Sequence, residues 1–308
     1  MTRYIVDRLM WIVPVMLGVS LIVFAIMKLV PGDVAEVMVG IDGTAEDVAN
    51  MRHTLGLDRP VHEQYISWLE RTVTLDLGRS AVTRRPITEE IASRIQPTAE
   101  LAVSALGLAI LLGILTGIVS AYWQYTIWDN LSTLVAIFGI SMPIFWLGLM
   151  LMMLFSVNLA ILPSTGAGTW QQLVLPAIAL GASSTATISR QTRSAMLEVL
   201  RQDFVRTARS KGLGEKMVVA RHVLKNAMIP TVTVTGLQLG QLLGGAVLTE
   251  TVFARPGLGR LLVDSIRMRD IAVVQDTIML LSVTFVVVNL MVDVVYVYLD
   301  PRIRYDQQ

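Results

Sequence analysis

Residues 206–225 read RTARSKGLGEKMVVARHVLK, and this stretch lies between two apolar segments of a chain that is mostly apolar. It holds six basic residues against one acidic residue, Glu215, and the glycines Gly212 and Gly214 divide it. A compact basic segment between apolar segments is typical of a cytoplasmic loop in a membrane protein. The apolar segments on both sides of it are therefore expected to span the membrane.

The expected secondary structure of this stretch is two helices with a glycine joint. Residues 196–211 read MLEVLRQDFVRTARSK and place apolar side chains on one helical face, namely Leu197, Leu200, Phe204 and Ala208. Gly212 and Gly214 end this helix, and EKMVVARHVLKNAM begins the next one. Small residues at the turn would let a partner surface come close.

The composition of the whole chain indicates that its solvent is lipid. Of 308 residues, 54% are hydrophobic and 16% charged, whereas soluble domains carry about 25% charged residues. A net charge of +1 gives no global basic field for nucleic acid. The absence of cysteine excludes disulfides, thiolate metal sites and cysteine nucleophiles. The histidines His53, His62 and His222 are scattered, so we expect no metal site.

Six apolar segments are long enough to be transmembrane helices, at about 20 residues per span. They are residues 9–30, 101–123, 134–157, 173–189, 227–249 and 274–299. The first is too long for the apolar region of a signal peptide and lacks a small-residue cleavage site, so we expect it to be retained. The sequence therefore predicts an all-α integral membrane protein with six transmembrane helices.

The fourth and fifth segments contain hydroxyl, amide and glycine residues that a helix facing only lipid does not need. In the fifth, Gly236, Gly240 and Gly244 recur every four residues, and we expect them to pack against another helix. Gln238 and Gln241 are three residues apart on a different face. These two glutamines either take part in helix packing or line a translocation path.

Residues 31–100, between the first two segments, have the composition of a soluble protein. Turn signals such as PGD and GLDRP alternate with amphipathic stretches such as VHEQYISWLERTV, and acidic residues outnumber basic ones. We predict that this segment of about 70 residues forms a mainly helical cap on one side of the membrane. The expected divisions are residues 1–30, the cap at 31–100 and a five-helix core at 101–305.

The basic residues predict which side of the membrane is cytoplasmic. Residues 190–225 hold nine Lys and Arg against three Asp and Glu, and further arginines flank the first and last spans. With six spans, all of these lie on one side, which the positive-inside rule assigns to the cytoplasm together with both termini. The outer loop 250–273 also carries four arginines, so the rule is not followed everywhere.

Motifs for nucleotide binding and hydrolysis are missing from the sequence. It contains no G-x-x-x-x-G-K-[ST], no H-E-x-x-H and no G-x-S-x-G. Asp293, one turn after Asn289, is the best candidate for an acid inside a span, and such an acid calls for a functional hypothesis. Because it lies near the end of its span, we expect a bond to a neighbouring helix rather than proton transport. The sequence indicates a membrane body without its own energy source or catalytic centre.

Residues 206–225 resemble the cytoplasmic coupling loop of the integral subunits of binding-protein-dependent ABC importers. The general motif of that family is EAA, three residues, Gly, nine residues and I-x-L-P, and here Gly212 stands at the glycine. Arg206, Thr207 and Ala208 stand at the EAA positions, and residues 222–225 at the I-x-L-P positions. The departures from the motif resemble the dipeptide, oligopeptide and nickel permeases, where RTARAKGL…RHALKNA-IP is common and this chain has RTARSKGL…RHVLKNAMIP.

Further matches to this branch run along the chain. They are VPGD (30–33), LGLDRPVHEQYISWL (55–69), DLGRS (76–80), SMPIFWLGL (141–149), TETVFARPGLGRLLVDSI (249–266) and YLDPRIRY (298–305). Val34 stands where a proline is common after PGD, and Leu75 where a glycine often precedes DLG. So many motifs in order identify the chain as similar to the dipeptide permease B-like members of the branch.

The resemblance implies a non-catalytic subunit with the transmembrane fold of type I importers in the cytoplasmic (inner) membrane of a prokaryote. It implies four kinds of partner: a homologous second permease, two ATPase subunits that bind ATP and Mg²⁺, an extracytoplasmic substrate-binding protein and a di- or oligopeptide substrate. Lipid surrounds the chain, no cofactor binds to it and nucleic acid is not a partner. The chain would form half of the path for the peptide.

The resemblance also implies roles for particular residues. A coupling loop at 194–227 would dock on an ATPase, and the expected docking residues are Arg206, Thr207, Ala208, Gly212, Leu213 and Glu215. The loop after the fifth span, with Glu250, Pro256 and Gly257, would either lie near the outer mouth of the path or be a plain turn.

Three alternatives compete with a peptide importer. A nickel or other small-solute importer belongs to the same branch, although the spans hold no His or Met cluster suited to such a metal. A secondary carrier usually shows internal repeats with interrupted spans in both halves, and no repeat is visible. A membrane enzyme would need a catalytic cluster, which is missing. The substrate itself is not readable from this sequence, because the separate binding protein largely selects it.

Overall fold

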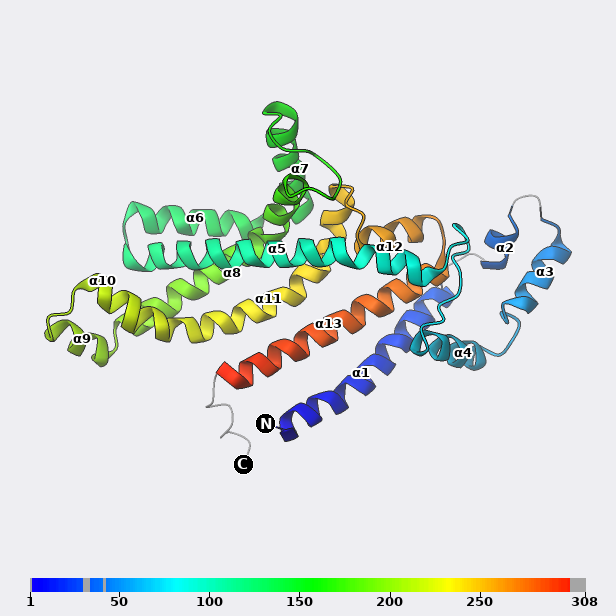
Figure 1. Ribbon diagram of the computed structural model, residues 1–308, viewed down its shortest axis with the longest axis horizontal. Helices are drawn as coiled ribbons and strands as arrows, with labels where there is room; N and C mark the ends of the chain where they lie inside the picture. The colour runs from blue at the N-terminus through cyan, green and yellow to red at the C-terminus, as the bar shows by residue number, and fades with distance from the viewer. Residues whose placement is uncertain (1, 30–33, 41–42, 300–308) are drawn as a thin grey trace. The chain divides into compact units, whose positions relative to one another are not determined.

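A computed structural model of the chain describes residues 2–29, 34–40 and 43–299, which are almost entirely helical (Figure 1). The VPGD motif and most of YLDPRIRY lie outside these described residues. Within them, the strand pairing is limited to an isolated bridge between Arg79 and Pro86. Five helices are long and apolar enough to cross a membrane, and a sixth span results if the bent pair α6–α7 counts as one. Helices suit this solvent because they satisfy every backbone polar group internally.

Packing divides the chain into two compact units. One comprises residues 99–255 with the chain from 288 onward, and the other comprises residues 2–98 with 256–287. Two long helices, α5 (Ile87–Tyr122) and α13 (Ile271–Leu299), contribute residues to both units. Because α5 begins at Ile87, the last part of the segment expected as a cap is already a continuous extension of the second spanning helix.

The unit of residues 2–98 and 256–287 combines α1 with short helices. These are α1 (Thr2–Leu29), α2 (Val34–Val39), α3 (Ala45–Thr54), α4 (Val61–Val73) and α12 (Leu258–Arg267). Helix α3 starts with a capping box in which Thr44 and Asp47 each accept a hydrogen bond from the other's backbone N–H. The hydrogen bonds from Thr44 lower the pKa of the exposed Asp47 carboxyl.

Helix α4 is anchored to α1 and α13 by aromatic side chains. The rings of Tyr65 and Trp68 lie 5.4 and 5.9 Å from the ring of Phe24 in α1. The indole N–H of Trp68 donates a hydrogen bond of 3.1 Å to Asp276 in α13. At the start of α13, Asp270 accepts a hydrogen bond of 2.5 Å from the hydroxyl of Ser80. Helix α4 and Ser80 therefore pack with α1 and the start of α13 within one unit.

The unit of residues 99–255 is built around α8 (Gln171–Leu200). Its other helices are α6 (Ile127–Ser141), α7 (Ile144–Met152), η1 (Met153–Asn158), α9 (Asp203–Ser210), α10 (Glu215–Met217), η2 (Val218–Val223) and α11 (Leu224–Val252). Helices α6, α7 and α11 all pack on α8, and α8 and α11 lie side by side in Figure 1.

Glycines let α5 approach α8 closely. A Cβ atom added at Gly117 would lie 2.6 Å from Cβ of Thr192, and one at Gly113 would lie 2.8 Å from Cβ of Ile188. From the side of α8, a Cβ at Gly181 would lie 2.8 Å from the carbonyl oxygen of Ala105. The two backbones are in contact where these residues meet, as small residues permit between membrane helices.

The expected third span, residues 134–157, is not one straight helix. Helix α6 ends at Ser141, α7 begins at Ile144, and their axes differ by 109°. Met142 between them is extended, with ψ 130°. The cause is Pro143, which has no N–H to donate and excludes the helical conformation from the residue before it. Figure 1 shows α7 turning away from the line of α6.

The contact between α5 and α8 predicts the effect of adding one methyl group. We expect Gly117→Ala to lower the free energy of unfolding by about 1–3 kcal/mol, because Cβ would overlap Thr192 and the backbone of α8. Gly107→Ala in the same helix is the matched control, since nothing lies within 4 Å of its Cβ position. Thermal unfolding of the purified protein in detergent, followed by tryptophan fluorescence, measures both. Equal midpoints for the two variants would contradict the close contact.

Candidate functional site

Residues 201–223 form an ordered elbow between α8 and α11 (Figure 1). Helix α8 ends at Leu200, and Gln202 is extended with ψ 149° before α9 begins at Asp203. The prediction of one helix over residues 196–211 is therefore wrong. The break falls at Arg201 and Gln202, which are exposed, and their N–H groups donate to the carbonyls of Glu198 and Val199 in a tightened last turn.

The break changes which side chains of α9 face inward. Val205 and Ala208 are 0% and 6% exposed, whereas Phe204 is 42% exposed. The apolar face expected from Leu197 and Leu200 through Phe204 assumed an unbroken helix. Because the helix is interrupted, Val205 rather than Phe204 is the residue of α9 that faces the buried cluster.

The inner face of the elbow packs on the ends of α5 and α8. One buried apolar cluster comprises Ala121, Ala195, Met196, Val205, Ala208, Val218, Val219, Val223 and Ala227. Its members come from α5, α8, α9, η2 and α11, and Ile118 and Leu200 pack against it. Burial of this apolar surface explains why the segment is an ordered elbow rather than a flexible basic loop.

The turn of the elbow depends on Gly212. Its φ is +82°, a left-handed conformation that side chains other than glycine rarely adopt. Its N–H donates to the carbonyl of Arg209 over 2.9 Å, and the N–H of Leu213 donates to that of Ala208 over 3.4 Å. These bonds close the end of α9 in the way that a C-terminal glycine allows. Gly214, by contrast, has φ −62°.

An ion pair spans this turn. Arg209 donates hydrogen bonds of 3.0 and 2.6 Å to the two carboxylate oxygens of Glu215. These bonds raise the pKa of the Arg209 guanidinium, because they favour its charged form. Both side chains are more than 40% exposed, so the pair contributes about 1 kcal/mol or less. Glu215, an expected docking residue, thus holds the shape of the turn.

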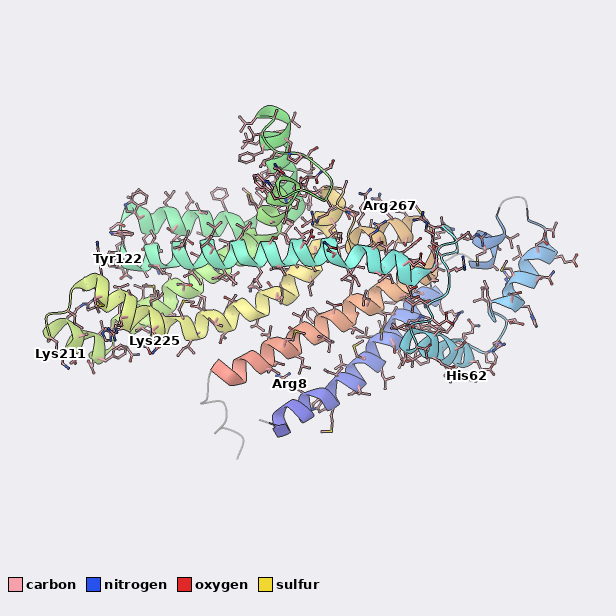
Figure 2. The ribbon with its side chains drawn as sticks, viewed as in Figure 1. Arg8, His62, Tyr122, Lys211, Lys225 and Arg267 are labelled. Atoms are coloured by element: carbon pink, nitrogen blue, oxygen red, sulfur yellow. The ribbon has the colours of Figure 1, made fainter. Side chains whose placement is uncertain are left out.

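The outer face of the elbow combines basic and apolar side chains. Of the expected docking residues, Arg206, Thr207, Gly212 and Leu213 are exposed, while Ala208 faces the buried cluster. Two exposed apolar side chains, Phe204 and Met217, were not predicted, because only the helix break reveals that they point outward. Figure 2 shows Lys211 at the tip of the elbow and Lys225 at the start of α11.

A pocket of about 460 Å³ separates the elbow from the end of α5. Its lining residues are Ala121, Tyr122, Gln124, Leu197, Leu200, Arg201, Arg209 and Glu215. Figure 2 shows Tyr122 and Lys211 at the same end of this unit. The turn between α5 and α6 and the elbow therefore share one surface.

A second, more buried ion pair lies beside the elbow. Arg193 of α8 donates two hydrogen bonds of 2.9 Å to the carboxylate of Asp129 in α6. The hydroxyl of Ser120 in α5 donates to Asp129 over 2.5 Å and accepts from Arg193 over 3.0 Å. The backbone N–H of Tyr125 also donates to Asp129, over 3.0 Å. The sequence did not predict this pair, since Asp129 and Arg193 are far apart in the chain.

Exposure differs between the two partners of this pair. The side chain of Asp129 is 5% exposed and that of Arg193 is 31% exposed. A bidentate arginine–carboxylate contact is among the strong charge-assisted hydrogen bonds and has a defined direction. Charged residues within membrane spans pair with one another in this manner.

The residues expected on the fifth span lie in different surroundings on α11. Gln238 is 5% exposed, and its Oε1 has no hydrogen-bond partner among the described residues, whereas Gln241 is exposed. A Cβ at Gly236 would lie 2.5 Å from Val292 of α13. Gly240 is buried, and Gly244 has nothing within 4 Å of its Cβ position. Among the described residues, Gly244 is therefore not a helix contact.

Charged residues are buried at the other end of α11. Glu250 is 0% exposed, and Arg255, 1% exposed, donates a hydrogen bond of 2.8 Å to Glu100 in α5. Arg255 was not predicted, although it follows Glu250 in the singled-out motif. Pro256 is half-buried and Gly257 is buried.

The acids inside the spans differ from the one expected. Asp293 and Asn289 are half-buried, whereas Asp129 and Asp276 are 4% and 5% exposed. Among the described residues, no group of three or more His, Cys, Asp and Glu side chains is arranged to hold a metal ion.

Comparisons with known proteins identify relatives along the whole chain. The family described as binding-protein-dependent transport system inner membrane component matches residues 109–305, and the N-terminal family of the same transport system membrane components matches residues 1–102. The glutathione transport system permease protein GsiC of Escherichia coli (strain K12) is 45% identical over 305 residues, 99% of this chain and 100% of the relative. The protein of that name from Salmonella typhimurium (strain LT2) is 46% identical over the same shares.

Two solved structures share the fold. An inward-facing structure of the MetNI methionine ABC transporter has a TM-score of 0.60 at 16% identity, covering 70% of this chain and 99% of that one. The crystal structure of an amino acid ABC transporter with histidines has a TM-score of 0.55 at 14% identity, covering 68% and 94%. At these identities the likeness concerns the fold alone.

The left-handed conformation at Gly212 predicts a local effect on the elbow. We expect Gly212→Ala to destabilise the elbow by about 1–2 kcal/mol, because an L-residue is strained at positive φ. Hydrogen exchange of the amides of α9 and α10 should become faster. Gly214→Ala is the matched control, since its φ is negative and nothing lies within 4 Å of its Cβ position. The same exchange rates in both variants would show that Gly212 is not the constraint.

Proposed function

The chain belongs to the permease subunits of binding-protein-dependent ABC importers, and we propose that it forms half of a peptide path driven by ATPase subunits docked on its elbow. It is a multi-pass protein of the inner membrane. A related permease would supply the other half of the path, and two ATPase subunits would bind ATP and Mg²⁺. A separate binding protein would deliver the substrate from outside.

The elbow carries the coupling part of this proposal. It is ordered by its own apolar cluster, and its outer face presents Arg206, Thr207 and Leu213 together with Phe204. An exposed apolar side chain among basic ones suits a protein partner, because burial of the apolar group supplies affinity and charge supplies orientation. ATP-driven motion can reach the spans only through contacts that differ between the states of the ATPases.

The named relatives support a peptide as the substrate class. Glutathione is a tripeptide, so a permease that resembles glutathione permeases along its full length fits a small peptide. Peptides carry amide groups and terminal charges, and the binding protein would recognise these groups before the peptide reaches the permease. Nickel remains the second candidate, because the sequence branch that the motifs indicate includes nickel permeases.

The proposed docking of ATPases on the elbow implies an orientation in the membrane. ATPase subunits act in the cytoplasm, so the elbow and both termini would lie on that side, and the Glu250–Gly257 loop on the other. The exposed line of α11 comprises Leu237, Gln241, Gly244 and Leu248, which recur at helical spacing. We assign this line to the path or to the facing permease, with Gln241 as its polar member.

Substrate-stimulated ATP hydrolysis tests the transport assignment. The chain, its neighbouring permease, the ATPases and the binding protein are assembled in lipid nanodiscs. Glutathione, dipeptides, tripeptides, longer peptides and nickel are then compared. We expect glutathione or another short peptide to raise hydrolysis above the level with binding protein alone. Stimulation by nickel only would transfer the chain to the nickel importers.

Charge and polarity changes on the outer face of the elbow test docking. Leu213 is exposed in this chain and would be buried against a docked ATPase. We therefore expect Leu213→Asp, which places a charge in that contact, to lower substrate-stimulated ATP hydrolysis about tenfold or more. Arg267→Glu, an exposed residue of α12, is the control and should keep the wild-type rate. Co-purification of the ATPases with each variant separates lost docking from lost transmission. Wild-type rates for Leu213→Asp would remove Leu213 from the docking face.

A further inference from the structure

We propose that the Asp129–Arg193 pair connects α6 to the elbow, so that α5, α6, α8 and the elbow move as one body during transport. The inference rests on the proposed function, because it takes the elbow as the place where the ATPases act. It concerns two residues that lie outside the sequence motifs quoted above.

The first step leads from the elbow to α8 and α5. Val205 and Ala208 of α9 are packed in the same buried cluster as Met196 of α8 and Ala121 of α5. Packed interiors transmit displacement because they have little free volume. A force on the outer face of the elbow therefore reaches the ends of α5 and α8 directly.

The second step leads from these ends to α6. Ser120 is the neighbour of Ala121, and Arg193 lies less than one helical turn before Met196, so the polar contact adjoins the apolar cluster. Asp129, in the first turn of α6, accepts hydrogen bonds from Ser120, Tyr125 and Arg193. Three helices thus meet at one carboxylate.

Packing between α6 and its neighbours is incomplete next to the Asp129–Arg193 pair. A cavity of about 200 Å³ lies between α5, α6 and α8, and Ser132, Val135 and Ala136 are its lining residues from the middle of α6. Helix α6 packs on α8 along its length, and a Cβ at Gly139 would lie 2.9 Å from the carbonyl oxygen of Ala182. The cavity removes part of the packing contact from the atoms that line it. The polar contact at Asp129 adds a directional link at the near end of α6 to this packing.

The geometry of the pair suits transmission better than apolar contact does. Two parallel hydrogen bonds between a guanidinium and a carboxylate fix both distance and direction. Apolar surfaces can slide past one another, whereas this contact breaks if either helix rotates. Lysine at position 193 would keep the charge but not the paired hydrogen bonds.

Distance measurements between introduced labels test the single-body motion. Because the chain contains no cysteine, Gln202→Cys in the elbow and Ile140→Cys at the end of α6 provide a labelled pair, and both positions are exposed. Spin-label distances are measured in the assembled complex in nanodiscs, without nucleotide and with ATP and vanadate. For the wild type we expect the same label distance without nucleotide and with ATP and vanadate. In Arg193→Lys and in Asp129→Asn we expect the distance to differ between these two states.

Transport provides the second readout. In the same complex in proteoliposomes, with glutathione as the probe, we expect Arg193→Lys to lower the number of molecules imported per ATP hydrolysed about fivefold or more. Asp264→Asn, which removes the partner of Arg260 within α12, is the control and should leave this ratio unchanged. A merely structural role would lower the amount of assembled complex but leave the ratio and the label distances unchanged.

The outcomes separate this inference from the proposed function. A nucleotide-dependent distance in the wild type overturns the single-body motion, whatever the variants do. Unchanged distances and ratios in both variants overturn the role of the pair. Failure of the wild-type chain to assemble with any ATPase instead overturns the proposed function.

Discussion

Close contact between α8 and its neighbours is the interaction on which the unit of residues 99–255 depends. In lipid the hydrophobic effect does not favour the association of two apolar helices, so van der Waals contact at short range has to stabilise their packing. Gly113 and Gly117 supply this contact for α5, and Gly139 supplies it for α6, where a Cβ would lie 2.9 Å from the backbone of α8. Thr192 and Ala182 lie opposite, so α8 acts as the common support.

The elbow extends this support beyond the spans. Because α8 breaks at Arg201 and Gln202, α9 turns its apolar residues Val205 and Ala208 back onto the end of α8. The same break turns Phe204 outward. One local interruption therefore produces both the buried cluster that orders the elbow and the exposed side chain that a partner can bury.

Two acids of the spans, Asp129 and Glu100, are paired with arginines. Asp129 is bonded to Arg193, and Arg255 to Glu100. The first pair lies beside the elbow and the second follows the other end of α11, so polar contacts mark both ends of this unit. Between them the contacts are made by small and apolar residues, with hydroxyl groups such as Thr116 bonded to Ser189.

The sequence by itself determined the solvent, the helical class, the family and the place of the elbow. Those properties depend on local quantities: apolar length, charge, and motifs read within about 20 residues of one another. The turn at Gly212 and Gly214 is of this kind, because glycine accepts a positive φ that excludes most other side chains. The structure shows that Gly212 is the glycine with positive φ. The family resemblance that its motifs carried was confirmed by relatives that match the chain from end to end.

Only the tertiary structure decided which of those residues face one another. The bend at Pro143 was present in the sequence, but its angle of 109° depends on what α7 packs against. The exposure of Phe204, the burial of Ala208 and the different surroundings of Gln238 and Gln241 depend on a helix break and on neighbours far away in the chain. The pairing of Asp129 with Arg193 joins residues from two helices that no periodicity relates. The physical reason is that burial and ion pairing are properties of contacts, and contacts between distant segments exist only after the helices have packed.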